Sequence, residues 1–294
     1  MAVPTAIRRT MAHIMGLQPA ASNMAIKHLQ AGWWLWLGRN RSNREDYANA
    51  LTCYERVLHI FPNHLRALAS VGNCLQHEGR YAEAMDFYDR VLQQRPDYPD
   101  IHARLGVIFC HLQRYQESID ALKRAFRVKP RLKEESCYGV TFAISLAYLG
   151  KTEDALEAYR AAVKQNPKNA GALAGVGWAL LELGNYADAE PPLRAAIKAE
   201  PGYGRPYLHL SLVLAGLGKY EESLVVAEQF AVLEPQDALA DSNVAELRLQ
   251  IGTAQLKSGD WEAAQIQCQL LQAMGSDKAD ELRNSIPAND QCKR

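Results

Sequence analysis

Two histidines, His77 and His111, lie 34 residues apart, and Cys110 directly precedes the second. Histidine and cysteine can bind a metal or form a nucleophile with its base, but a metal site would need closer convergence and a third ligand. Cys110 and His111 are neighbours in sequence and therefore point to different sides of a helix. The chain also has no glycine-rich phosphate loop, no Gly-x-Ser-x-Gly segment and no His-Glu-x-x-His segment. We therefore expect no catalytic residue, no metal and no cofactor, and hence no enzyme; polar contacts to a partner are the expected role of the two histidines.

The cysteines support the same expectation. They form no Cys-x-x-Cys pair and match no zinc or haem spacing: Cys53, Cys74, Cys110, Cys137, Cys268 and Cys292. The N-terminal apolar stretch is interrupted by Arg8, Arg9 and His13, unlike a secretory signal peptide. We expect free thiols, mostly buried, in a reducing compartment, and a cytoplasmic location. Because no acidic residue precedes Glu45, organelle targeting is the alternative.

Charge is balanced overall but not along the chain. The 33 Lys and Arg equal the 33 Asp and Glu, while residues 1–133 carry a net +8 and residues 134–294 a net −8. Apolar residues make up 48% and charged residues 22%, which excludes a disordered chain or a collagen, and no apolar run is long enough to span a membrane. This uneven distribution of charge either steers an anionic partner to one end, favours head-to-tail pairing of copies, or reflects only solvated surfaces.

The elements that position these residues recur with a fixed period. Prolines mark it at intervals of 34 residues, with three residues inserted between the third and the fourth: Pro62, Pro96, Pro130, Pro167, Pro201 and Pro235. Within each window, apolar residues follow helical spacing in two runs separated by a turn. A small residue in the middle of the first run would let the second helix approach closely: Gly38, Gly72, Gly106, Ala143, Gly177, Ser211 and Gly252.

The first window combines Trp34, Leu37 and Gly38 with Ala50 and Pro62. This pattern resembles the tetratricopeptide repeat, which implies an all-α, right-handed superhelical solenoid of antiparallel helix pairs. Seven windows fit: 31–64, 65–98, 99–132, 136–169, 170–203, 204–237 and 245–278. Residues 1–30 form an N-terminal segment outside the pattern, and residues 279–294 a short cap and a disordered tail.

Several departures from the pattern carry expectations of their own. Arg248 and Gln255 stand at usually apolar places, which suits a terminal repeat facing solvent. The insertions 133–135 and 238–244 are expected to lengthen the helices that follow them. Ser22 is expected to cap a helix that runs into Trp34. Pro191 and Pro192 are expected to kink the second helix of the fifth window. A final short helix is expected to cover the last repeat with Leu282 and Ile286.

The resemblance implies that the first helix of each pair lines a concave groove where peptides bind. The matching candidates are Trp36, Arg39, Asn43, Arg66, Asn73, His77, Arg104, His111, Val140, Ile144, Tyr148, Trp178, His209 and Leu212. They are basic and hydrogen-bonding at the N-terminal end, and aromatic and aliphatic further on. A peptide with an acidic end and an apolar middle would fit them. For any single polar residue, plain solvation is the simpler alternative. The two-carboxylate clamp of chaperone-binding relatives is not expected, because Asp100 opposes it.

The sequence thus predicts a non-catalytic interaction scaffold that binds a peptide or protein segment. Two alternatives stay open: a regulatory or adaptor subunit of an enzyme or secretion complex, and an RNA-associated protein that uses its basic half, although nucleic acid is the less expected partner. Trp33 is predicted to face the N-terminal side, where only residues 1–30 can cover it. Self-association through Trp33 and that segment is therefore a further expectation.

Overall fold

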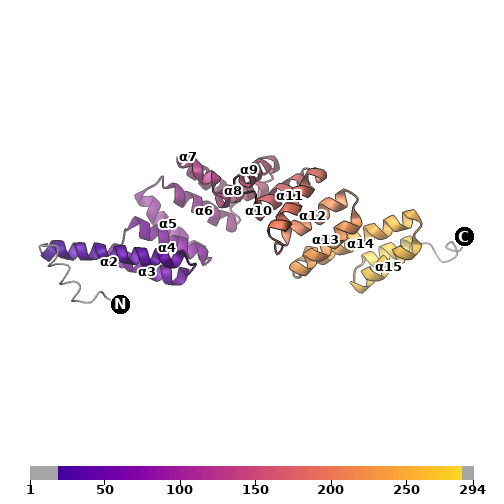
Figure 1. Ribbon diagram of the computed structural model, residues 1–294, viewed down its shortest axis with the longest axis horizontal. Coiled ribbons are helices and arrows are strands. Elements are labelled where there is room, and N and C mark those ends of the chain that lie inside the picture. Colours follow the sequence, from indigo (N-terminus) through magenta and orange to yellow (C-terminus); the bar gives the residue numbers. More distant parts are fainter. Residues whose placement is uncertain (1–18, 287–294) are drawn as a thin grey trace. The chain divides into compact units, whose positions relative to one another are not determined.

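The computed structural model describes residues 19–286, which form two compact units, 19–132 and 133–286. Every regular element in these residues is a helix, which confirms the predicted all-α class. The helices pack as successive pairs, as predicted for a solenoid (Figure 1). The expectations for residues 1–18 and 287–294, including the disordered tail and the thiol of Cys292, lie outside the described residues.

The first unit contains three helix pairs. In chain order they are α2 (Pro19–Ser42) with α3 (Tyr47–Ile60), α4 (Leu65–His77) with α5 (Tyr81–Gln94), and α6 (Pro99–His111) with α7 (Tyr115–Val128). The 3-10 helix η1 (Pro130–Glu134) follows them.

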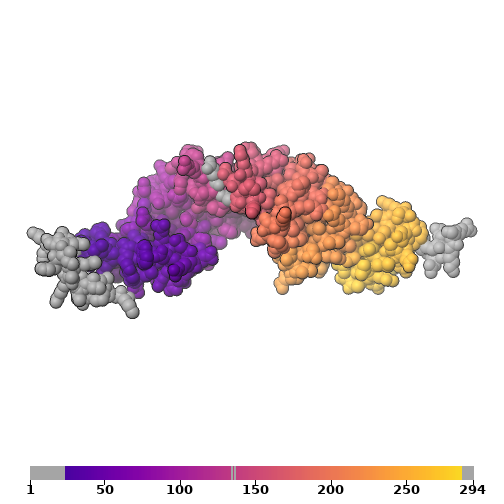
Figure 2. Space-filling model, in the orientation of Figure 1, coloured from indigo at the N-terminus to yellow at the C-terminus, as the bar shows by residue number. Residues whose placement is uncertain are grey.

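The second unit contains four pairs and a final short helix. These are α8 (Ser136–Tyr148) with α9 (Thr152–Gln165), α10 (Ala170–Glu182) with α11 (Tyr186–Ala199), α12 (Arg205–Gly216) with α13 (Tyr220–Leu233), α14 (Ala238–Ser258) with α15 (Trp261–Ala273), and α16 (Lys278–Ser285). Within each unit the surface colour changes pair by pair in chain order, because each pair packs mainly against its neighbours (Figure 2).

The small residues of the first helices are required by the packing. A Cβ on Gly72 would lie 2.5 Å from the Tyr88 ring, and one on Gly177 would lie 2.3 Å from Leu193 Cγ. These two pairs of helices therefore close against a position without a side chain, which confirms the role predicted for these glycines. In the last pair, a Cβ on Gly252 would instead be 2.5 Å from Leu282 Cδ2 of α16.

The turn inside each pair uses a left-handed backbone conformation. Gly79 and Gly184 adopt φ values of 74° and 73° at this place, which a glycine does without steric cost. In the first and third pairs the same place is held by Glu45 and Gln113, with φ values of 61° and 60°. The repeat thus keeps the left-handed turn even at two residues whose side chains disfavour this conformation.

Two of the predicted helix boundaries need correction. The insertion 133–135 does not lengthen α8, because its residues lie in η1 and in the N-cap of α8. Ser22 lies inside α2 rather than at its start. The insertion 238–244 does lengthen α14, which runs for 21 residues, as predicted. Pro191 and Pro192 lie inside α11, and the kink predicted there stays a prediction.

Two side chains of the last repeat are also more buried than predicted. The Arg248 side chain is only 14% exposed, and its guanidinium lies 2.6 Å from Glu228 Oε1 in the preceding pair. Gln255 is half-buried rather than facing solvent. The helix α16 acts as the predicted cap, since Leu282 is fully buried and Ile286 packs against the same cluster.

The five cysteines in residues 19–286 are thiols rather than disulfides. Cys53, Cys74 and Cys268 are buried, Cys110 is half-buried and Cys137 is exposed. Burial raises the pKa of the Cys74 thiol to about 12, so it stays protonated and unreactive. No helix in residues 19–286 has both the length and the apolar character needed to cross a membrane.

Candidate functional site

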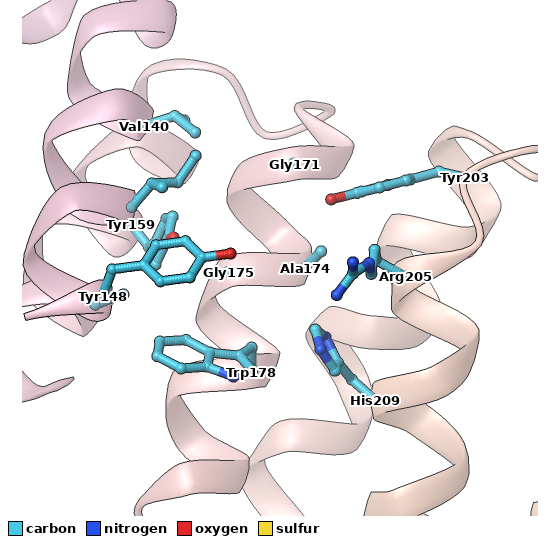
Figure 3. Close-up of a pocket in the computed structure, with 12 residues that line it drawn as sticks. Val140, Tyr148, Tyr159, Gly171, Ala174, Gly175, Trp178, Tyr203, Arg205 and His209 are labelled. Carbon is cyan, nitrogen blue, oxygen red and sulfur yellow. The ribbon is translucent and has the colours of Figure 1, made fainter. Parts of the chain in front are cut away.

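The second unit contains a cavity of about 440 Å³ between the first helices of three successive pairs. Helices α8, α10 and α12 contribute most of its wall (Figure 3). Its lining residues are Val140, Ile144, Ala147, Tyr148, Tyr159, Gly171, Ala174, Gly175, Trp178, Tyr203, Arg205 and His209.

The floor of this pocket is a stripe of small residues along α10. Gly171, Ala174, Gly175 and Trp178 recur at helical spacing on one face, so the first three leave space that ends at the indole of Trp178. A Cβ on Gly175 would lie 2.3 Å from the ring of Tyr159, which is 4% exposed. Gly175 therefore lets the Tyr159 ring of α9 pack directly against the floor.

Polar groups enter the pocket from two sides. Tyr148, the last residue of α8, stands on one side, and Tyr203 and Arg205 stand on the other, before and at the start of α12. The hydroxyl groups of both tyrosines and the guanidinium of Arg205 point into the space between the helices (Figure 3). Burial raises the pKa of the Tyr203 phenol, so both the hydroxyl and its hydrogen-bonding capacity are kept at neutral pH.

His209 lies one helical turn after Arg205 and faces the same space. Burial, and to a smaller extent the charge of Arg205, lower the pKa of His209 from 6.5 to about 4. The imidazole is therefore neutral at pH 7. Its Nδ1 atom is buried, and no other described residue forms a hydrogen bond with it.

The arrangement suits the binding of an apolar group with polar edges. Aromatic rings and small aliphatic side chains form the walls, and a few polar groups point into the space from two sides. No cluster of three metal-binding side chains occurs anywhere in the described part of the chain.

Five of the predicted groove residues of this unit meet in the pocket: Val140, Ile144, Tyr148, Trp178 and His209. Leu212, also predicted, is 42% exposed and does not line it. The prediction missed Tyr159, Tyr203 and Arg205. Arg205 and His209 share one face of α12 because they are four residues apart, and this spacing is the signal that would have found Arg205.

The predicted residues of the first unit are arranged differently. Arg104 of α6 donates a hydrogen bond to Asn73 Oδ1 of α4, so these two candidates bind each other. The rings of His77 and Tyr47 stack with centroids 4.3 Å apart, and His111 stacks on Tyr81 at 5.5 Å. Each histidine therefore packs against the second helix of the preceding pair.

The remaining four candidates are exposed on this unit. Trp36 is 60% exposed on α2, and Arg39, Asn43 and Arg66 are also exposed. Of the three predicted arginines, Arg39 and Arg66 remain solvent-exposed cations, whereas Arg104 is half-buried.

Comparison with known proteins gives a family and a fold. Family models described as tetratricopeptide repeat match residues 40–105, 88–130 and 140–204, together more than half of the chain. The comparison with curated proteins found no match.

Solved structures share the fold at low sequence identity. PilF of Pseudomonas aeruginosa is 16% identical, with 76% of this chain and 99% of that one covered and a TM-score of 0.64. PilW, described as a type IV pilus biogenesis factor, is 17% identical, with 72% of this chain and 97% of that one covered and a TM-score of 0.61. A chain of the Cut9–Hcn1 complex of the APC/C is 14% identical, with 74% of this chain and 42% of that one covered and a TM-score of 0.64.

Proposed function

Because the chain belongs to the tetratricopeptide repeat family, we propose that it is a non-catalytic protein-interaction scaffold. Its pocket between α8, α10 and α12 receives an apolar side chain from a peptide segment of the partner. The observation that supports this proposal is the pocket itself, where five predicted groove residues converge, among them Tyr148, Trp178 and His209.

The size and lining of the pocket agree with this role. Its volume of about 440 Å³ exceeds that of one large apolar side chain, which leaves space for neighbouring peptide atoms. Full burial of a Phe, Leu or Met side chain contributes about 1.5–3 kcal/mol, enough to anchor a segment without any covalent step.

A cavity-filling substitution tests the proposal. Gly171 lines the pocket, and a Cβ there meets only the side-chain oxygen of Asn169, at 3.4 Å, so Gly171→Trp adds an indole without a backbone clash. Ala195 is exposed on the second helix α11, and Ala195→Trp is the matched control.

Peptides selected from a random library on the full chain serve as probes, and calorimetry measures their affinity. We expect Gly171→Trp to weaken binding about ten-fold or more, a loss of about 1.4 kcal/mol, and Ala195→Trp to leave it unchanged. Equal affinity for wild type and Gly171→Trp, or the absence of any peptide that binds wild type, would contradict the proposed function.

A second contact, with another copy of the chain, is proposed for α2. Leu29, Trp33 and Trp36 follow one another at helical spacing and are 46%, 50% and 60% exposed. The residues around them are basic, since no acidic residue precedes Glu45, whereas residues 134–294 carry a net −8. This complementarity favours head-to-tail association of two copies.

A further inference from the structure

Arg205 brings a positive charge to the pocket. Its guanidinium forms no hydrogen bond or ion pair with any other residue of the described part, although ten ion pairs occur there. The described residues that line the pocket include no Asp or Glu. An anionic group that enters the pocket therefore meets one cation and no carboxylate among the lining side chains, although the charge of Glu200 acts on Tyr203 from outside the lining.

His209 adds a second unused group beside this cation. Its ring and the Arg205 guanidinium extend from the same face of α12 toward the same space (Figure 3). A buried imidazole nitrogen without a hydrogen-bond partner is unfavourable, and a ligand atom that pairs with it removes this cost. In the tautomer with a proton on Nδ1, the imidazole has an unused hydrogen-bond donor on the same helix face as Arg205.

We propose that the pocket selects peptide segments in which a carboxylate lies next to the apolar anchor side chain. This proposal rests on the proposed function and names its ligand class. The carboxylate oxygens accept hydrogen bonds from the Arg205 guanidinium and from the His209 imidazole, while the anchor lies over the small-residue floor of α10.

A carboxylate fits better than a phosphate group. A carboxylate carries a single charge, and its two oxygens match the fork of one guanidinium. A phosphate monoester carries nearly two charges at neutral pH, and Arg205 is the single cationic side chain among the described lining residues.

Four short synthetic peptides test the proposal. The first is acetyl-Ser-Asp-Phe-Leu-Ser-amide, and the second replaces its Asp with Asn. The third is acetyl-Ser-Ser-Phe-Leu with a free terminal carboxylate, and the fourth is the amide of the third. These pairs separate a side-chain carboxylate from a terminal one, and ligand-observed NMR titration measures their dissociation constants.

We expect at least one acidic peptide to bind wild type about three- to ten-fold more tightly than its neutral counterpart, with the difference shrinking as salt is added. Arg205→Gln is expected to abolish the difference but retain binding of the neutral peptides, and Arg205→Lys to retain part of it. Equal affinity within both pairs, or an unchanged difference in Arg205→Gln, would overturn the proposal.

The outcomes separate this proposal from the one on which it rests. If neutral and acidic peptides bind equally and Gly171→Trp still abolishes binding, the carboxylate proposal fails and the proposed function stands. If Gly171→Trp binds all four peptides as wild type does, or if none of them binds wild type, both fail.

Discussion

Replacing Gly177 with alanine is expected to destabilise the second unit, although alanine normally stabilises a helix. Gly177 lies in the middle of α10, where a Cβ would be 2.3 Å from Leu193 Cγ and 2.6 Å from Leu193 Cδ2. Leu193 is fully buried, so its side chain has no free space into which to move. The two helices would have to separate to accept the methyl group.

The expected magnitude follows from two opposing effects. Alanine in place of glycine inside a helix contributes up to about 1 kcal/mol. Overpacking of a closed core costs about 1–3 kcal/mol, and a contact of 2.3 Å belongs at the upper end of that range. We expect a net loss of about 1–2 kcal/mol in the free energy of unfolding.

Urea unfolding followed by circular dichroism measures this loss, and amide hydrogen exchange in α10 and α11 locates it. Gly171→Ala is the matched control on the same helix, because its Cβ would meet only a contact at 3.4 Å, and we expect no loss. Combining Gly177→Ala with Leu193→Ala should recover about 1–3 kcal/mol relative to the sum of the single changes. A Gly177→Ala protein as stable as wild type would refute the helix register described above.

Three further predictions concern other parts of the chain. Gln113→Gly is expected to raise the free energy of unfolding by up to about 1 kcal/mol, because Gln113 has a φ of 60°; an unchanged urea midpoint would contradict this. His209 is protonated near pH 6.5 when unfolded but only near pH 4 when folded, so the folded state loses stability as the pH falls through this window. Between pH 7 and pH 5 the free energy of unfolding of wild type should fall by about 2 kcal/mol, a loss that His209→Gln should not show. Equal losses for both proteins in urea titrations would disprove this. Trp33→Glu is expected to reduce concentration-dependent association in sedimentation velocity, whereas Val232→Glu, on the exposed face of α13, should not; equal sedimentation of both variants and wild type would exclude the α2 contact.

The repeat made most of the fold predictable from the sequence. Pro62 and its equivalents mark where second helices end, because the residue before a proline disfavours the helical conformation, and α3 indeed ends at Ile60. Gly72 and Gly177 mark where paired helices touch. These signals are local and recur with a constant spacing, so the periodicity of the sequence carries them.

Contacts between repeats were less predictable because they depend on side chains far apart in sequence. The burial of Arg248 depends on Glu228 of the preceding pair, which no local pattern indicates. The pocket likewise needs three helices at once, and Tyr203 reaches it from the loop before α12. The first helices alone therefore identified Tyr148, Trp178 and His209, but not the groups from the loop and from α9.

The location of a bound peptide is the most direct test of the proposed pocket. Methyl NMR of the full chain, titrated with a peptide selected on it, reports this location. We predict that the methyl signals of Val140, Ile144 and Ala174, which line the pocket, shift on binding, whereas those of Val225 and Val232, exposed on α13, stay in place. Shifts confined to Val225, Val232 or the first unit, with the pocket signals unchanged, would contradict the account.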